Sequence, residues 1–143
     1  MNTVNPTRDQ LETILAQVPM DQPVVMLNLL RFREQAQYAG DSAHSPVTGR
    51  EAYQRYAAVA QKKLVEIGAR VEWAGRSLGT LIGPEEKPWD EVFLVRYPTA
   101  QAFFNMLSMP DYQAAAEHRT AALEDSRLIV TQGEIVAPSG ASQ

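Results

Sequence analysis

The chain has no cysteine among its 143 residues, which excludes disulfide bonds and thiolate metal sites. Its 13 Lys and Arg residues are interspersed with 17 Asp and Glu residues, so there is no basic stripe for nucleic acid. No apolar run is long enough to span a bilayer, and the polar start MNTVNPTRDQ lacks the basic and apolar regions of a signal peptide. These absences favour a cytoplasmic protein that binds neither membranes nor nucleic acid.

The sequence also lacks the patterns that hold metals and cofactors. It contains no glycine-rich phosphate-binding pattern and no pair of histidines at metal-ligand spacing. The two histidines, His44 and His118, are far apart, and no pattern supports either as a haem ligand. The serine in GRSLG lies in a strand-like region, without the strand–elbow–helix setting of a hydrolase. We therefore expect no metal and no cofactor.

What the chain does contain is a regular succession of helix and strand patterns. Capping boxes at Thr7–Gln10 and Thr48–Glu51 predict helices that end near Val18 and at Gly68. Thr99 caps a third helix, and Pro110 begins a continued or kinked one. Apolar segments bounded by turn residues predict strands. The expected helices are 7–18, 48–67, 100–109 and 110–125. The expected strands are 24–32, 69–83, 89–98 and 126–137.

Without the first helix, this order is β-α-β-β-α-β. It predicts an α+β domain of the ferredoxin-like kind, in which a four-stranded antiparallel sheet carries two helices on one face. We expect this domain to span residues 23–137. A helical extension, 1–22, would precede it and a disordered tail, 138–143, would follow it.

The second face of the predicted sheet needs a cover. The strands VVMLNLL and VFLV are apolar at both parities, whereas a sheet with one solvated face should alternate. A second copy of the chain, packed sheet to sheet, is the simplest cover and gives a homodimer. The alternative is a monomer in which the N-terminal helix and the long loop after the first strand fold across the sheet.

Asn28 is an amide in the middle of an apolar strand, so it is either structural or part of a site. If Arg31 lies opposite Glu91, Asn28 faces Leu94 and lies diagonal to Arg96 on one sheet face. The amide and the guanidinium would then orient a ligand's carbonyl or carboxylate. The alternatives are a purely structural amide and a one-residue slip in register, which would separate the pair.

Five further residues are candidates for a site, three for its pocket and two for a lid. Arg119 lies on the stripe of its helix that packs on the sheet, so it must pair with a carboxylate, cap a carbonyl or meet an anionic ligand. Of these, an internal salt bridge is the favoured interpretation. Tyr53 and Trp73 combine an apolar body with a donor and are candidate pocket walls. Tyr38 and His44, in the turn-rich loop 33–47, are candidates for a lid.

Two blocks, YPTAQAFFNMLSMPDYQ and HRTAALEDSR, carry a resemblance to a known family. With VVMLNLLRF and the helix around Tyr53, the chain resembles the domain-of-unknown-function 1330 family of the dimeric α/β-barrel superfamily over most of residues 24–130. The resemblance implies a two-sheet dimer barrel and no established reaction. The wider superfamily is similar in architecture only. It includes cofactor-free oxygenases acting on aromatic quinols, muconolactone-type isomerases, haem-degrading proteins and ligand binders.

Two functions agree with these features. The first is a dimeric protein that binds a small hydrophobic or anionic molecule and has no catalytic motif. The second is a cofactor-independent oxygenase or isomerase acting on a small hydrophobic, anionic or phenolic compound. In that case Asn28, Tyr53, Trp73 and Arg96 would line its pocket. The sequence leaves open whether the protein is an enzyme.

Overall fold

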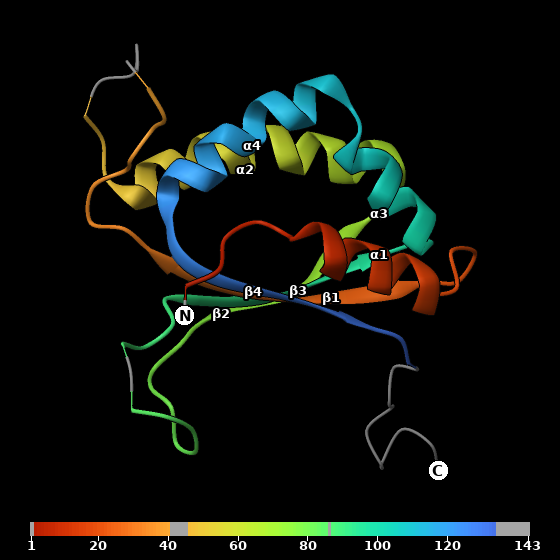
Figure 1. Ribbon diagram of the computed structural model, residues 1–143, viewed down its shortest axis with the longest axis horizontal. Coiled ribbons are helices and arrows are strands. Elements are labelled where there is room, and N and C mark those ends of the chain that lie inside the picture. The colour runs from red at the N-terminus through yellow and green to blue at the C-terminus, as the bar shows by residue number, and fades with distance from the viewer. Residues whose placement is uncertain (1, 41–45, 86, 134–143) are drawn as a thin grey trace.

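The computed structural model describes residues 2–40, 46–85 and 87–133. Its four strands form one antiparallel sheet in the order β2-β3-β1-β4, with α2, α3 and α4 on one face (Figure 1). This confirms the predicted α+β, ferredoxin-like fold. Within one chain, however, the sheet is open and not a closed barrel. The elements are α1 (Arg8–Gln17), β1 (Val24–Phe32), α2 (Gly49–Ile67), β2 (Arg70–Arg76), β3 (Glu91–Tyr97), α3 (Ala100–Leu107), α4 (Pro110–Ala122) and β4 (Leu123–Thr131).

The helices begin and end where local chemistry places them. Both capping boxes form, with Thr7 and Thr48 each accepting a hydrogen bond from the backbone N–H three residues on. Gly68 ends α2 in the left-handed conformation, at a φ of 76°. Pro110 is the first residue of α4, which is therefore a separate helix from α3. None of the helices in the described ranges combines the length and the apolar character needed to cross a membrane.

Two predicted boundaries are wrong. The fourth helix ends at Ala122, not at residue 125, because Leu123 and Asp125 are buried in β4 and hydrogen-bonded alongside β1. Pairing with a central strand here overrides the helical pattern. The second strand ends at Arg76, so residues 77–83 belong to the connection to β3. Of the predicted last strand, residues 134–137 lie outside the described residues, as does the predicted tail 138–143.

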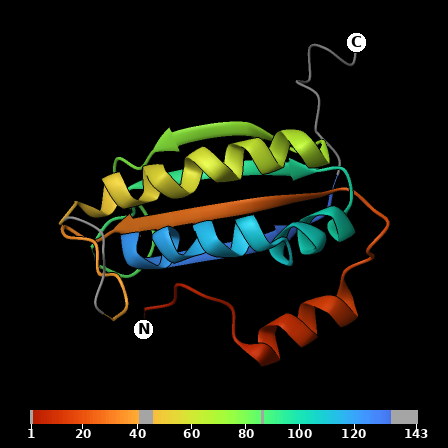
Figure 2. The ribbon, with the colours of Figure 1, turned by 90° about the horizontal axis from the view of Figure 1, so that it is seen from above.

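The two faces of the sheet have different surroundings. On the face below the helices, Val24, Met26 and Leu30 of β1 are at most 1% exposed. The opposite face, which we call the open face, carries partly exposed apolar side chains, including Trp73 at 54% and Ile129 at 46%. The monomer alternative required α1 to cross this face. Instead α1 buries none of its residues and lies beside the sheet, beyond α4 and β4 (Figure 2), so it does not cover the open face.

The core beneath the helices consists of two clusters that meet at the middle of β1. Val24 and Met26 belong to the first cluster, and Leu30 and Phe32 belong to the second. Phe93 of β3 packs against both clusters. Asn28 lies between Met26 and Leu30 on the same side of the strand, so it occupies the boundary between the clusters.

The N-terminal segment is tied to the sheet and to α3. Thr3 accepts a hydrogen bond from the Ser126 N–H at 2.7 Å and donates its own N–H to the Asp125 carboxylate at 2.7 Å. The Met20 carbonyl accepts from the Gln101 N–H at 3.0 Å. The extension therefore runs along the β4 edge of the domain, which protects an edge that would otherwise expose unpaired backbone groups.

Candidate functional site

The predicted pairing of Asn28 with Arg96 is wrong. Asn28 lies opposite Phe93, and Arg96 lies opposite Val25, so the two side chains occupy opposite faces of the sheet. The register differs by one residue from the expected one, because Glu91 lies opposite Leu30 and not opposite Arg31.

The charges that suggested the other register find different partners. Arg31 is buried and pairs with Asp125 of β4 at 3.2 Å. Glu91 instead lies 3.5 Å from Arg50 of α2. Opposite charges therefore do pair at this end of the sheet, but between β1 and β4 and between β3 and α2, and not between β1 and β3.

Asn28 faces the helices and is partly exposed, although Met26 and Leu30 on either side of it are sealed. Among the described residues, its one side-chain hydrogen bond runs from Nδ2 to the carbonyl of Met26 at 3.2 Å. Leu128 lies opposite Asn28 on β4, on the same face, and is 45% exposed. The middle of this face, at Asn28 and Leu128, is therefore less deeply buried than the two core clusters on either side of it. We call the surroundings of Asn28 and Leu128 the core gap.

Tyrosines from the helices lie on both sides of the core gap. The Tyr53 ring packs in the second cluster, 5.4 Å from the Phe32 ring, whereas Tyr56 packs against the first. The two tyrosine rings are 5.2 Å apart. The Tyr56 hydroxyl is 2.6 Å from that of Tyr112 on α4. The tyrosines of α2 and α4 therefore join the two core clusters on the helix side, and their phenol groups are largely buried.

Burial raises the pKa of Tyr53 and of Tyr56 well above the ordinary tyrosine value, and the nearby Arg119 guanidinium only partly opposes that rise. Both phenols therefore stay protonated at neutral pH. Protonated phenols donate hydrogen bonds but do not act as general bases.

Arg119 donates from Nη1 to the Val4 carbonyl at 2.6 Å. The structure thus shows the carbonyl cap, and the internal salt bridge that the sequence favoured is not found among the described residues. A guanidinium has five N–H donors, so this contact leaves donors of Arg119 beside the tyrosines.

Trp73 and Arg96 lie on the open face, away from the core gap. Trp73 lies opposite Leu94 of β3, and its ring lies across Gly75, where an added Cβ would be 2.6 Å from the ring. Arg96 Nη1 lies 3.9 Å from the Glu72 carboxylate. Asn28 and Tyr53 therefore do not share one pocket with Trp73 and Arg96 within a single chain, and this part of the prediction is wrong.

The loop after β1 contains a polar contact that the sequence did not indicate. The Tyr38 hydroxyl is 2.6 Å from His118 Nδ1, and Arg55 Nη1 donates to the same hydroxyl at 3.3 Å. Tyr38 and His118 are 80 positions apart, so no local pattern brings them together. The other lid candidate, His44, lies outside the described residues. A lid role for this loop stays a prediction.

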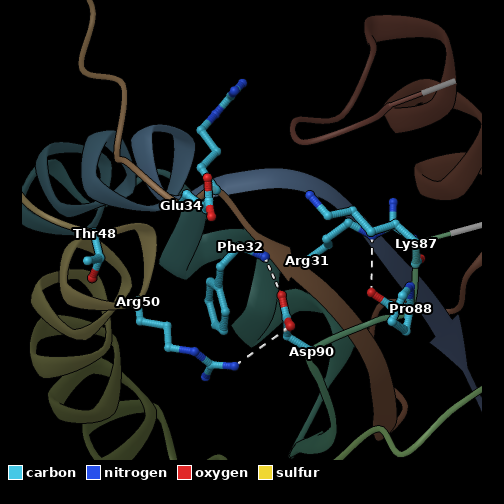
Figure 3. Close-up of a pocket in the computed structure, with 9 residues that line it drawn as sticks. Arg31, Phe32, Glu34, Thr48, Arg50, Lys87, Pro88 and Asp90 are labelled. Carbon is cyan, nitrogen blue, oxygen red and sulfur yellow. Dashed lines mark hydrogen bonds and ion pairs between the residues drawn. The ribbon is translucent and has the colours of Figure 1, made fainter.

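An opening of about 480 Å³ lies at the end of β1, where α2 begins. Figure 3 shows Arg50 reaching toward Asp90 across it, at 3.7 Å, with the Arg50 guanidinium 4.8 Å from the centre of the Phe32 ring. Asp90 also accepts from the Phe32 N–H at 2.7 Å, and Lys87 pairs with Glu124 at 3.1 Å. Arg50, Asp90, Lys87 and Glu124 thus have charged or backbone partners, whereas Arg33, which also lines the cleft, has a buried Nε without a hydrogen-bond partner among the described residues. Within the described ranges no group of three potential metal ligands gathers.

Comparison with known proteins gives a family and a fold. A family model described as "Domain of unknown function (DUF1330)" matches residues 42–133. No curated protein matches the chain. Among solved structures, the protein of unknown function RPA0582 from Rhodopseudomonas palustris is 36% identical, with a TM-score of 0.86 over 95% of this chain and 100% of that chain.

Two more distant structures share the fold alone. A hydroxynitrile lyase from Passiflora edulis is 12% identical, with a TM-score of 0.53 over 82% of this chain and 99% of that chain. An uncharacterized NIPSNAP domain protein from Burkholderia xenovorans is 15% identical, with a TM-score of 0.52 over 81% of this chain and 99% of that chain. Such a fold hosts unrelated activities, so these two structures carry no functional information.

Proposed function

This chain belongs to the DUF1330 family, a family of unknown function, and we propose that it is a homodimeric protein that binds a small, largely apolar molecule in the core gap. The observation that carries the proposal is the partly exposed Asn28 amide, which lies on an otherwise sealed strand face between two core clusters. A buried strand face keeps such an amide at a cost in stability, and proteins accept that cost at binding sites.

The chemistry of the core gap points to a ligand that carries a hydrogen-bond acceptor. Tyr53 keeps its proton, and its hydroxyl has no hydrogen-bond partner among the described residues. Arg119 has donors beyond the one that Val4 accepts. Leu128 and Phe93 supply apolar surface beside Asn28. A carboxylate, a carbonyl or a phenolate on a hydrophobic body fits this set of donors and apolar walls.

The proposal of a homodimer is based on the side chains of the open face. Leu27, Leu29 and Leu94 are partly exposed there, beside Trp73 and Ile129. Apolar side chains in a contiguous patch of this kind mark an interface, and a second copy of the same face is the simplest complement. Two packed sheets would also make the barrel that a single open sheet cannot form.

Catalysis by cofactor-independent oxygenation or isomerisation receives less support. Such reactions need a base or an acidic substrate, and the phenols of Tyr53 and Tyr56 stay protonated because burial raises their pKa. The geometry therefore supports binding, with any reaction depending on the acidity of the bound compound itself.

A thermal-shift screen of small phenols, lactones and carboxylates tests the proposal. A ligand present at 100 times its dissociation constant stabilises the protein by about 2.7 kcal/mol, which is a measurable rise in melting temperature. Asn28→Leu should abolish that rise, whereas Arg96→Leu, on the opposite face, should keep it. Equal effects of the two variants would contradict the site, and a monomeric mass for the wild type by light scattering at micromolar concentration would contradict the dimer.

A further inference from the structure

The connection between β2 and β3, which we call the arm, consists of residues 77–85 and 87–90 in the described structure. It exposes three large apolar side chains almost completely: Leu78 at 91%, Leu81 at 97% and Ile82 at 92%. Figure 1 shows that the arm projects from the sheet on the side away from the helices, which is the side of the open face. Apolar side chains gathered at such a tip mark an interaction surface.

The base of the arm is held by a buried ion pair and an aromatic ring. The Arg31 guanidinium lies 4.5 Å from the centre of the Trp89 ring, and Arg127 lies 5.2 Å from it. Arg31 Nε also donates to the Pro88 carbonyl at 3.2 Å, as Figure 3 shows. Arg31 is only 5% exposed and pairs with Asp125, which is also buried. Residues 88 and 89 are therefore fixed to the ends of β1 and β4.

Asp90 secures the arm to β1 by two further hydrogen bonds. Its N–H donates to the Leu30 carbonyl at 2.7 Å, and its carboxylate accepts from the Phe32 N–H at 2.7 Å. The Ser77 N–H donates to the Asp90 carbonyl at 3.3 Å, which joins the two ends of the arm. The base of the arm is therefore fixed to the sheet, and this holds the exposed apolar tip on the side of the open face.

We propose that the arm packs its apolar tip against a second copy of this chain, an inference that rests on the homodimer of the proposed function. Three side chains are too few for a stable interface, which buries roughly 800 Å² on each partner. The tip must therefore act together with a contiguous surface, and the surface on its own side is the open face of Leu27, Leu94 and Trp73. A partner that packs on the open face would therefore also contact the tip of the arm.

A two-fold dimer makes this contact reciprocal. The arm of one protomer reaches the other protomer, and the partner's arm returns the same contact, so each substitution at the tip acts twice in the dimer. The arm then closes the sheet-to-sheet interface from one end. Its apolar tip is the part of the interface that lies outside the sheet.

Sedimentation over a concentration series tests the arm with the double variant Leu81→Ser, Ile82→Ser. We expect its dimer dissociation constant to be at least tenfold weaker than that of the wild type. The control is Val65→Ser, which changes a side chain 80% exposed on α2 and should leave the dissociation constant unchanged. Because the substituted side chains are exposed in the single chain, all variants should keep the far-UV circular dichroism spectrum of the wild type.

Cross-linking gives a second measurement, because the chain has no cysteine of its own. Leu81→Cys labelled with benzophenone maleimide should yield a covalent dimer on irradiation, and Val65→Cys should yield none. Suppose that the wild type is a dimer, but that the double variant has the same dissociation constant or that Leu81→Cys gives no cross-link. Either result would contradict the contact of the arm alone. A monomeric wild type would contradict both the proposed homodimer and the proposed contact of the arm. The apolar tip would then be a binding surface for a different protein.

Discussion

Asn28 of β1 and Arg96 of β3 lie on opposite faces of the sheet, because the antiparallel register pairs Asn28 with Phe93 and Arg96 with Val25. Asn28 faces the helices at the core gap, and Arg96 faces the open side beside Glu72. The sheet itself separates the two side chains, so each belongs to a different surface of the molecule. Ligand binding and dimer formation can therefore be tested with separate substitutions.

Replacing Asn28 with Leu should leave the free energy of unfolding unchanged or raise it by up to about 1 kcal/mol, because the amide bonds only to its own strand and is partly exposed. Urea unfolding of the ligand-free protein measures this. In a double-mutant cycle with Arg96→Leu, the two effects should add to within about 0.5 kcal/mol. A loss of several kcal/mol in Asn28→Leu would show that the amide holds the core together.

The register was the part of the fold that the sequence could not specify. The starts of α1 and α2 follow from local chemistry, the capping boxes at Thr7 and Thr48, and were predicted correctly. Register depends on which strand face is buried, and β1 and β3 are apolar at both parities, so the pattern fits either alignment. The partner of Arg31 is Asp125, which the helical pattern had assigned to the preceding helix.

Only part of the candidate site could be predicted, because local sequence does not specify which distant segments come together. Asn28 is unusual for its strand, and Arg119 is unusual for its helix stripe, so each could be found from local sequence. Leu128 as a neighbour of Asn28, and His118 as a partner of Tyr38, depend on how distant segments come together. Local periodicity contains no information about those contacts.

Leu27→Asp should dissociate the homodimer, because it would place an unpaired carboxylate inside the packed open faces at a cost of several kcal/mol. Leu27 lies at the centre of β1, opposite Leu94 and Ile129 on its two neighbouring strands. Light scattering at micromolar concentration should give the mass of a monomer for this variant and of a dimer for Val65→Asp, the control on α2. A dimeric Leu27→Asp protein would show that the open face is not the interface.

Gly49→Ala should destabilise the fold, because a Cβ at this first residue of α2 would lie 2.2 Å from the Arg33 carbonyl oxygen and 2.7 Å from that of Ala122. These atoms are backbone, so relief requires α2 to move away from β1 and α4. We expect a loss of about 1–3 kcal/mol, measured by thermal unfolding. Gly133→Ala is the control, since nothing lies within 4 Å of its added Cβ. Equal melting temperatures for the two variants would contradict the close approach.

The buried Asp125 carboxylate should make stability fall in acid. Burial opposes ionisation of Asp125, but hydrogen bonds from the Thr3 N–H, from Arg127 and from the Ser126 N–H outweigh it and hold the pKa of Asp125 below its ordinary 3.8. A carboxyl group whose folded pKa is depressed stabilises the native state above its unfolded pKa. That contribution is lost as the pH falls through the folded pKa, which places the loss below about pH 4.

Asp125→Asn isolates this contribution, because it keeps the shape of the side chain and removes its charge. At pH 7 the variant should unfold about 3–5 kcal/mol more easily in urea, because the buried Arg31 loses its ion pair with Asp125. The difference from the wild type should shrink below about pH 4, where Asp125 of the wild type becomes protonated as well. The double variant Arg31→Met, Asp125→Leu should recover most of the loss, because it removes both buried charges. A difference that stays constant from pH 7 to pH 3 would show that the carboxylate's charge does not stabilise the fold.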